Sequence, residues 1–335
     1  MNKGCVNFIV KKEGSINIGV VGVGHLGNFH LKQLGGIPQV SISGLYDSNP
    51  KRAEEMSFRY NVPVHTSLEE LLSASDAVSV VTPTSYHYAV ADRALDADCH
   101  LFIEKPITDN INHARLLLEK ANKLNKIIQV GHIERFNPAF TVLKNLDIQP
   151  RFIEAHRLAE FNPRGNDVPV ILDLMIHDLD IILSLVKSEI NDIKANGVKV
   201  VSATVDIANA RLEFENGCVA NLTASRISQK IMRKIRLFQE RDYITIDFQN
   251  GVLEEYKVYD KSPTSEKDDQ LVELGGKEKK YVQYRKPDVP KHDALREELI
   301  HFADSIIQGQ QPETDGQSAA NALSLALKIQ KIIDK

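Results

Sequence analysis

The chain has 335 residues, enough for two domains with substantial cores, and its 42% hydrophobic and 26% charged residues are typical of soluble globular proteins. A formal net charge of −4 gives no reason to expect nucleic acid or an anionic membrane as a partner. The three cysteines, Cys5, Cys99 and Cys218, are scattered, which argues against a disulfide framework or a structural zinc, and we predict no metal site.

Residues 1–15 are predicted to be an N-terminal extension to the first domain. Their apolar stretch is short and is followed by Lys11 and Lys12, so the segment lacks the apolar core and cleavage signature of a secretory signal. No run of residues approaches the length of a membrane span. We therefore expect a cytoplasmic protein with no membrane partner.

A strand, a glycine-rich turn and a helix follow directly. Residues 16–21 are a short run rich in β-branched residues, which predicts a buried strand. The motif G-x-G-x-x-G comes next, and apolar residues then recur at helical spacing. In a dinucleotide site Gly22 permits the tight turn, Gly24 lets a pyrophosphate approach the backbone, and Gly27 lets the helix pack closely on the strand. An ordinary turn without a ligand is the alternative.

The neighbouring residues favour the cofactor interpretation. The helix begins near His25 and Leu26, where unpaired N–H groups can bind phosphates. A second predicted strand, residues 40–47, ends in Asp47, close to the spacing expected of a carboxylate that binds an adenosine ribose. That carboxylate would repel a 2′-phosphate, so NAD is expected as the cofactor. Arg52 can reach such a phosphate, which keeps NADP open.

Strands and helices alternate up to residue 135, which predicts an α/β, doubly wound parallel sheet: a Rossmann domain over residues 16–135. Further strands are expected at 62–65, 77–81, 100–103 and 127–131, and helices at about 49–60, 67–72, 86–97 and 112–125. In such folds ligands bind beyond the carboxyl ends of the strands. The candidate residues at those positions are Thr82, Pro83, His87, Glu104, Lys105 and His132.

From residue 136 the pattern predicts an α+β domain, residues 136–335, with a large and mostly antiparallel open sheet. Helices are expected at 137–145, 171–186, 292–308 and 317–333. Strands are expected at 152–157, 193–201, 204–214, 217–225, 231–239 and 243–248. Residues 261–280 are polar and charged, which predicts a mobile loop between strands.

The predicted helix at 171–186 carries one candidate group of chemical side chains. Asp173, His177 and Asp180 fall at i, i+4 and i+7, on a different face from an apolar stripe. A carboxylate and an imidazole one turn apart can contact the same bound molecule, and histidine exchanges protons near neutral pH. A solvated polar face is the alternative, and the nucleotide-binding fold upstream favours a site.

Glu104-Lys105-Pro106 is the second candidate group. It follows a predicted strand, and Pro106 prevents a helix from absorbing Lys105. Beside a nicotinamide, a partly desolvated lysine can polarise or deprotonate a substrate hydroxyl. The alternative is a solvent-exposed lysine in a loop.

Three motifs in this order, Gly22 to Gly27, Glu104-Lys105-Pro106, and Asp173 with His177, resemble the glucose–fructose oxidoreductase / inositol dehydrogenase (Gfo/Idh/MocA) family over nearly the whole chain. The resemblance implies a homodimer or homotetramer formed through the sheet of the C-terminal domain. It also implies that Lys105, Asp173 and His177 are catalytic and line the substrate pocket against the nicotinamide. Which of Lys105 and His177 is the base stays open.

A second set of motifs resembles the branch of this family that oxidises the 3-hydroxyl of nucleotide sugars such as UDP-N-acetylglucosamine. The residues that carry it are Glu134, Arg135 and Asn137, which would bind sugar hydroxyls or an acetamido group, and Arg157 and Arg164, which would hold a diphosphate. A structural ion pair between Glu134 and Arg135 or Arg157 is the alternative.

The expected function is therefore oxidation of a secondary hydroxyl of a sugar or nucleotide sugar by a nicotinamide-dependent dehydrogenase. Two other functions stay open: a dehydrogenase of a free sugar or inositol, and a non-catalytic dinucleotide-binding regulator, because a fold does not fix a function.

Overall fold

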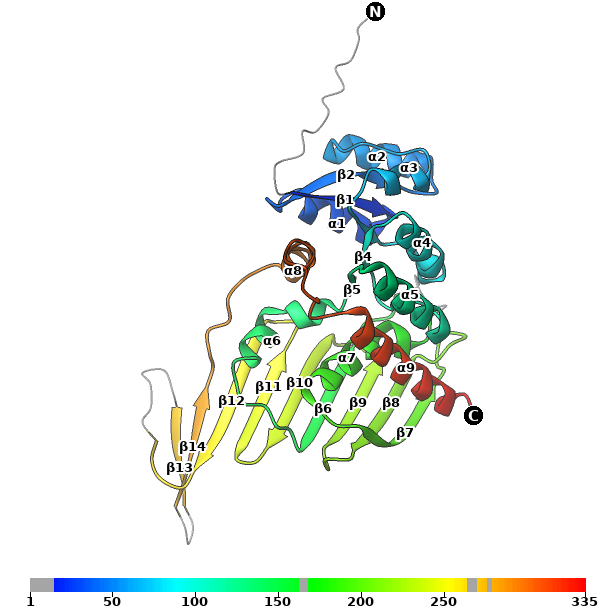
Figure 1. Cartoon of the computed structure of the whole chain (residues 1–335). Helices are drawn as coiled ribbons and strands as arrows, with labels where there is room; N and C mark the ends of the chain where they lie inside the picture. Colours follow the sequence, from blue (N-terminus) through cyan, green and yellow to red (C-terminus); the bar gives the residue numbers. More distant parts are fainter. Residues whose placement is uncertain (1–14, 163–167, 264–269, 276–278) are drawn as a thin grey trace, which may run out of the picture. The chain divides into compact units, whose positions relative to one another are not determined.

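The computed structural model describes residues 15–162, 168–263, 270–275 and 279–335, and their contacts divide the chain into two compact units (Figure 1). The first unit comprises the described part of residues 1–132 together with Leu295–Ala320. The second comprises Ile133–Ala294 and Asn321–Lys335. The contact boundary thus follows His132, where the sequence predicted a boundary after residue 135.

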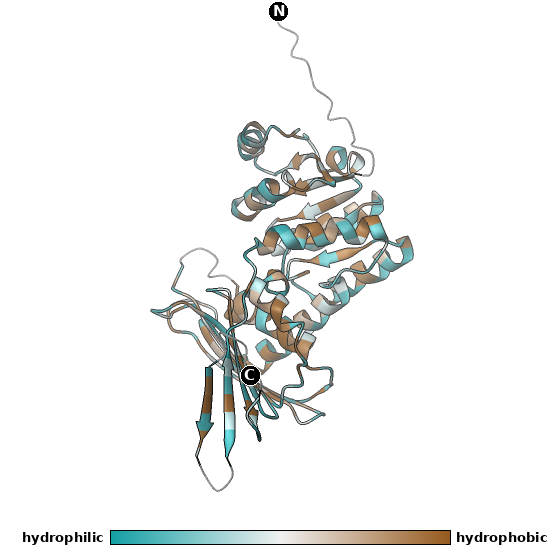
Figure 2. Ribbon diagram, turned by 90° about the vertical axis from the view of Figure 1, so that its left-hand side faces the viewer, coloured by the Kyte–Doolittle hydropathy of each residue, from teal (hydrophilic) through white to brown (hydrophobic). Residues whose placement is uncertain are grey.

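The first unit is built on a parallel sheet of five strands, in the order β2-β1-β3-β4-β5 within the described residues. The strands are β1 (Ile16–Val21), β2 (Val40–Tyr46), β3 (Ala77–Val80), β4 (His100–Ile103) and β5 (Ile128–Val130). Their helices are α1 (His25–Leu34), α2 (Pro50–Tyr60), α3 (Leu68–Ser73), α4 (Thr84–Asp96) and α5 (Ile111–Leu124). Figure 2 shows hydrophobic and hydrophilic residues alternating along these helices, as expected where one face covers a sheet and the other meets water. The predicted Rossmann fold is confirmed.

The strand predicted at residues 62–65 is wrong in extent, because only one parallel bridge, between Leu45 and Val64, forms there. Pro63 has no N–H to donate to a ladder, which limits pairing along this edge. Counted with this bridge, the order of strands is that of a Rossmann domain, and the order reverses between β1 and β3. Ligands bind at such a point of reversal, beyond the carboxyl ends of the strands.

Helix α8 (Ala294–Gln308) comes late in the chain, yet almost all of it belongs to the first unit. Leu299, Phe302 and Ala303 are fully buried in the same apolar cluster as residues of β1, β2 and α1. Phe302 also packs edge-on against Phe102 of β4. The linear division of the sequence at residue 136 could not show that this helix completes the nucleotide-binding core.

The second unit contains a sheet of nine strands, in the order β13-β14-β12-β11-β10-β6-β9-β8-β7 within the described residues. All neighbours are antiparallel except the parallel pair β6 and β9. The strands before residue 250 are β6 (Phe152–Leu158), β7 (Ile190–Val198), β8 (Ile207–Phe214), β9 (Val219–Ser225), β10 (Met232–Gln239) and β11 (Asp242–Asp247). The helical elements are η1 (Ile133–Phe136), α6 (Pro138–Leu143), η2 (Ile171–Met175), α7 (Ile176–Leu185) and, from Asn321 onward, α9 (Gly316–Ile333).

The sequence missed three strands at one end of this sheet: β12 (Val252–Tyr259), β13 (Gln270–Leu274) and β14 (Lys280–Arg285). The mobile loop predicted at 261–280 is therefore wrong where β13 forms; residues 264–269 and 276–278 lie outside the described residues. β13 is exposed along its whole length, so it has no apolar alternation to detect. In β12 the polar Glu255 occupies a buried position, which breaks the expected pattern.

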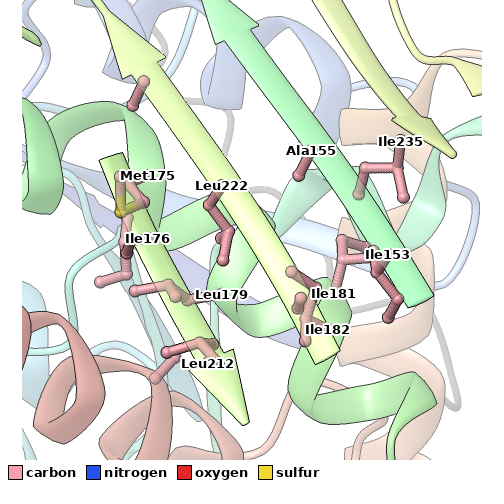
Figure 3. Close-up of a cluster of buried hydrophobic side chains, with 14 of the residues drawn as sticks. Ile153, Ala155, Met175, Ile176, Leu179, Ile181, Ile182, Leu212, Leu222 and Ile235 are labelled. Carbon is pink, nitrogen blue, oxygen red and sulfur yellow. The ribbon is translucent and has the colours of Figure 1, made fainter. Parts of the chain in front are cut away.

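One face of the sheet carries the core of the second unit. Figure 3 shows Met175, Ile176, Leu179 and Ile182 of the helical segment packed against side chains of β6, β8, β9 and β10. Residues from the second half of α9, among them Leu325 and Ile329, join the same cluster. Each fully buried aliphatic side chain of this kind contributes about 1.5–3 kcal/mol to stability.

The opposite face of the sheet carries an aromatic row, which we call the aromatic ladder: Phe152, Phe238, Tyr243, Tyr256 and Tyr284. Successive rings are direct cross-strand partners on neighbouring strands, with centroids 4.8 to 5.6 Å apart. Because side chains alternate along a strand, these rings point away from the core that Ile153 and Ile244 enter. Every ring of the ladder is only partly buried in the single chain.

Candidate functional site

The glycine turn between β1 and α1 has two closely packed glycines and one open glycine. Gly22 has a φ of +86°, and a Cβ there would lie 2.8 Å from the carbonyl oxygen of Val81. A Cβ at Gly27 would lie 2.0 Å from the carbonyl oxygen of Gly22. Nothing among the described residues lies within 4 Å of a Cβ built at Gly24, which is the N-cap of α1. The open side of the turn therefore faces the start of the helix, where a pyrophosphate can meet backbone N–H groups.

Asp47 and Arg52 both contact this turn. Asp47 Oδ2 accepts a hydrogen bond from the N–H of Val23 at 2.8 Å, and its Oδ1 accepts from the N–H of Asn49 at 2.8 Å. Arg52 Nε donates to the carbonyl oxygen of Val23 at 2.9 Å, and its Nη1 pairs with Glu55 at 2.9 Å. The carboxylate is thus fixed beside the turn, with acceptor capacity left for ribose hydroxyls.

The ends of β3 and β4 are joined by His87. Its two ring nitrogens lie 2.9 Å from the carbonyl oxygens of Thr82 and of Pro106. Burial lowers the pKa of His87, so the neutral ring donates through one nitrogen at a time. Thr82 Oγ1 is buried and makes no hydrogen bond within the described part of the chain. The hydroxyl of Thr82 is therefore a candidate ligand contact, whereas His87 positions the two loops.

The sequence did not predict the partner of Glu104. Glu104 Oε1 lies 2.9 Å from His30 Nε2, and His30 Nδ1 lies 2.9 Å from Ser79 Oγ. A Cβ at Gly131 would lie 2.9 Å from Glu104 Oε2, so the carboxyl group also fills the space beside that glycine. Burial alone would raise the pKa of Glu104, but the hydrogen bond from His30 and the charge of Lys105 hold this pKa below its ordinary value.

A signal for this network was present in the sequence. His30 falls on the side of α1 that packs on the sheet, and Ser79 interrupts the apolar strand β3. Two polar side chains at core positions require partners, because an unpaired buried polar group is destabilising. The hydrophobic periodicity of α1 places His30 on the face that packs against the sheet, but it does not indicate Ser79 and Glu104 as the partners of His30.

In the second unit, Asp173 and His177 lie on either side of a change in helix type. Ile171–Met175 form a π-helical turn, η2, and α7 follows it from Ile176; the sequence predicted one continuous α-helix. Asp173 and His177 are partly exposed, whereas the third predicted member, Asp180, is 1% exposed. π-helical turns occur often at functional sites, and here the turn points Asp173 in a different direction around the helix axis than a continuous α-helix would.

Asp180 belongs to a buried network of charges. Arg135 Nε donates to Asp180 at 2.6 Å. Arg157, 3% exposed, donates from Nη2 to Asp178 and from Nη1 to Glu134, at 2.8 Å each. Burial disfavours the guanidinium charge, but the two carboxylates outweigh it and raise the pKa of Arg157 above its ordinary value.

These contacts change the expectation for the sugar and diphosphate ligands. Arg157 is bound on two sides by carboxylates of its own unit, which supports the ion-pair alternative over a role in holding a diphosphate. Asn137 caps α6 through its Oδ1 and donates its amide to Phe248 O at 3.0 Å. Glu134 and Arg135 are likewise bonded within the unit, and Arg164 lies outside the described residues.

The candidate residues thus form two groups, each described within its own unit. The glycine turn, Asp47, Arg52, Thr82, Glu104 and Lys105 lie in the first unit, at or beyond the carboxyl ends of its parallel strands. Asp173 and His177 lie in the second unit, beside the buried network of charges. Within the described residues, no three His, Cys, Asp or Glu side chains gather as a metal ion would require. No helix there combines the length and apolar character needed to cross a bilayer.

Comparison with known proteins agrees with the fold. Residues 16–132 match the Gfo/Idh/MocA model described as an oxidoreductase family with an NAD-binding Rossmann fold, and residues 150–254 match the C-terminal domain model of the same family. The chain is 37% identical to the UDP-N-acetylglucosamine 3-dehydrogenase of Acidithiobacillus ferrooxidans, over 94% of this chain and 96% of that protein.

Other relatives are more distant or agree at the level of structure. A crystal structure of the Acidithiobacillus ferrooxidans enzyme superposes with a TM-score of 0.86 at 36% identity, and the match covers 96% of this chain and 98% of that one. The myo-inositol 2-dehydrogenase of Thermotoga maritima is 25% identical over 96% of this chain and 97% of its own length. The glycine turn, the sheet that carries it and these matches lead to one conclusion: the chain belongs to the Gfo/Idh/MocA family of oxidoreductases with an NAD-binding Rossmann fold.

Proposed function

We propose that this protein oxidises the 3-hydroxyl of a UDP-N-acetylhexosamine, with a nicotinamide dinucleotide as the hydride acceptor. The observation that carries the proposal is its 37% identity, over 94% of its length, to a UDP-N-acetylglucosamine 3-dehydrogenase. Lys105, Asp173 and His177, which the resemblance to the family implies are catalytic, are all present in this sequence and support the proposal. A regulator that only bound dinucleotide would have no need for all three side chains.

The residues of the first unit suit a dinucleotide. Gly24 leaves open space at the N-terminus of α1 for a pyrophosphate, and the carboxylate of Asp47 is held beside the same turn. We propose NAD over NADP, because this carboxylate repels a 2′-phosphate and the guanidinium of Arg52 is already bonded to Val23 and Glu55. The bound dinucleotide supplies the hydride acceptor.

The proposed roles of the side chains follow from their chemistry. His177 takes the proton of the sugar hydroxyl as the carbon–hydrogen bond breaks, because an imidazole exchanges protons near neutral pH. Lys105 carries a positive charge that stabilises the developing oxyanion. Asp173 accepts a hydrogen bond from a neighbouring hydroxyl and so orients the sugar. His177 and Lys105 can exchange roles without altering the proton balance. Of the two arginines expected from the sequence to hold the diphosphate, we retain Arg164 in that role.

The test is a panel of UDP-sugars, GDP-sugars, free sugars and inositols, each with NAD and NADP, followed by the absorbance of the reduced nicotinamide. UDP-N-acetylglucosamine with NAD should give the highest kcat/KM. His177→Ala and Lys105→Ala should each lower kcat by about a hundredfold or more while dinucleotide affinity stays unchanged. His113→Ala and Lys123→Ala, on α5, are matched controls that should retain activity.

Each other result identifies a different function. Higher activity on inositol or a free sugar, with no requirement for a nucleotide, would replace the proposed substrate. Dinucleotide binding without reduction on any substrate would favour the regulator. Near-normal turnover in both His177→Ala and Lys105→Ala would refute the assigned roles.

We also propose that the protein self-associates through the face of the sheet that carries the aromatic ladder. Its five rings span neighbouring strands and are only partly buried in one chain. Tyr243→Lys and Tyr256→Lys place charges in the middle of that row and should shift the protein to monomers in sedimentation equilibrium. A mass unchanged by both substitutions, in folded protein, would exclude this face.

A further inference from the structure

The inference concerns the network of His30, Ser79 and Glu104 in the first unit. These residues come from α1, from β3 and from the position directly after β4. His30 is 1% exposed, Ser79 is fully buried, and the side chain of Glu104 is 15% exposed. A largely buried carboxylate and two buried polar side chains beside a parallel sheet are unfavourable unless each is bonded.

The hydrogen bonds connect the three side chains in one row. A carboxylate accepts hydrogen bonds, so His30 Nε2–H donates to Glu104 Oε1 at 2.9 Å. The hydroxyl oxygen of Ser79 lies 2.9 Å from His30 Nδ1, on the other side of the ring. Glu104 Oε2 accepts from the backbone N–H of Lys105 at 3.3 Å, and an ideal Cβ at Gly131 would lie 2.9 Å from it. The carboxylate is thus held by the imidazole of His30, which Ser79 contacts in turn, and by the backbone N–H of its own neighbour in the chain.

The consequence concerns Lys105, the residue that follows. Lys105 is the next residue in the chain, its backbone N–H donates to Glu104, and its positive charge lowers the pKa of that carboxyl group. A fixed negative charge restricts where the flexible side chain of Lys105 places its ammonium. Burial disfavours the ionised form of Glu104, and the hydrogen bond from His30 is the largest effect that opposes it.

We propose that His30 is a positioning residue for Lys105: it fixes the Glu104 carboxylate, which in turn directs the lysine ammonium toward the reacting hydroxyl. The inference rests on the proposed function, in which Lys105 stabilises the oxyanion. His30 itself contacts neither cofactor nor substrate in this scheme. Its effect reaches the chemistry only through Glu104.

The experiment compares His30→Leu, His30→Gln, Glu104→Gln and the double variant His30→Leu/Glu104→Gln. His30→Leu removes the donor and should lower kcat about tenfold or more, with KM and dinucleotide affinity within about twofold of wild type. His30→Gln keeps an N–H donor and should recover most of the activity. Glu104→Gln should resemble His30→Leu. The double variant should be no worse than the poorer single variant, because both changes break the same connection.

A second readout does not depend on turnover. The rate at which acetic anhydride acetylates Lys105, followed by peptide mass spectrometry, should rise about threefold or more in His30→Leu and stay at the wild-type level in His30→Gln. His100→Leu is the matched control: it removes a histidine that accepts a bond from Ile127 at the other end of β4, and should leave both readouts unchanged.

The outcomes separate the two proposals. A kcat of His30→Leu within about twofold of wild type, or losses that multiply in the double variant, would overturn the positioning role. An unchanged acetylation rate of Lys105 would also overturn it. If the wild-type protein reduced no dinucleotide with any substrate, the proposed function would fall, whereas the acetylation rates would still decide whether His30 controls Lys105.

Discussion

Gly24 and Gly27 stand three residues apart in one turn, but an added methyl group should lower the stability of the protein at Gly27 and its affinity for NAD at Gly24. In Gly27→Ala the new Cβ would lie 2.0 Å from a backbone carbonyl oxygen, so α1 must move away from β1. Overpacking of this kind costs about 1–3 kcal/mol, and a backbone neighbour places the expected loss of unfolding free energy near the upper value. In Gly24→Ala the Cβ meets nothing within 4 Å, and the poorer N-cap costs at most about 1 kcal/mol.

Gly24→Ala should lower dinucleotide affinity more than it lowers stability. The methyl group of Gly24→Ala occupies the space through which a pyrophosphate would approach, so NAD should bind at least about tenfold more weakly, a loss of about 1.4 kcal/mol. Urea unfolding gives the stability of each variant, and titration calorimetry with NAD gives the affinity. Wild-type affinity in a stable Gly24→Ala would refute the placement of the pyrophosphate. An undiminished stability of Gly27→Ala would refute the packing argument.

Three further predictions concern charged side chains. Arg157→Met leaves two carboxylates buried without their guanidinium and should cost about 3–5 kcal/mol in urea unfolding, whereas Arg236→Met, which breaks a half-exposed pair on the same sheet, should cost less than about 1 kcal/mol. Asp206 accepts hydrogen bonds from the backbone N–H groups of residues 200–202 at 2.7 to 2.9 Å. Burial alone would raise the pKa of Asp206, but the hydrogen bonds hold this pKa well below 3.8. The folded protein therefore binds a proton at Asp206 less readily than the unfolded chain does, so the stability that Asp206 contributes is complete above pH 3.8 and is lost as the pH falls below that value. Asp206→Asn should cost about 2 kcal/mol of unfolding free energy at neutral pH and should weaken the dependence of that free energy on pH in acid. Asp47→Ser should raise the kcat/KM ratio of NADP to NAD by about tenfold or more, and an unchanged ratio would remove Asp47 from the ribose site.

The sequence predicted best those parts of the fold whose signal is local. The strands and helices of the first unit follow from short apolar runs, caps such as Asn49 and Ser67, and the glycine turn, and most bounds agree within a few residues. What it could not predict depends on contacts between distant segments. α8 joins the first unit because Phe302 and Leu299 pack into the core of that unit, and the residues around position 300 do not indicate which of the two units they pack against.

The candidate site divides in the same way. The motif residues Gly22 to Gly27, Asp47 and Lys105 stand out by type and spacing along the chain. The ion pairs of Arg157 and the bond from His30 to Glu104 depend on which carboxylate lies nearest in the fold, and those partners are distant in sequence. From the sequence, the arginine of the motif was therefore as well explained by phosphate binding as by a structural ion pair, and only the contacts in the fold distinguish the two.

The late position of α8 has a consequence for how the protein is made. The ribosome releases the strands of the first unit long before the segment that carries Leu299, Phe302 and Ala303. Until that segment emerges, the apolar surface it covers stays open to solvent or to chaperones, so the core of this unit cannot be completed before residues 295–303 have been synthesised. A gene fragment that stops at His132 would encode a nucleotide-binding domain without part of its interior. A circular permutant that brings Leu295–Ala320 next to β1 would restore it, and is the better starting point for producing that unit alone.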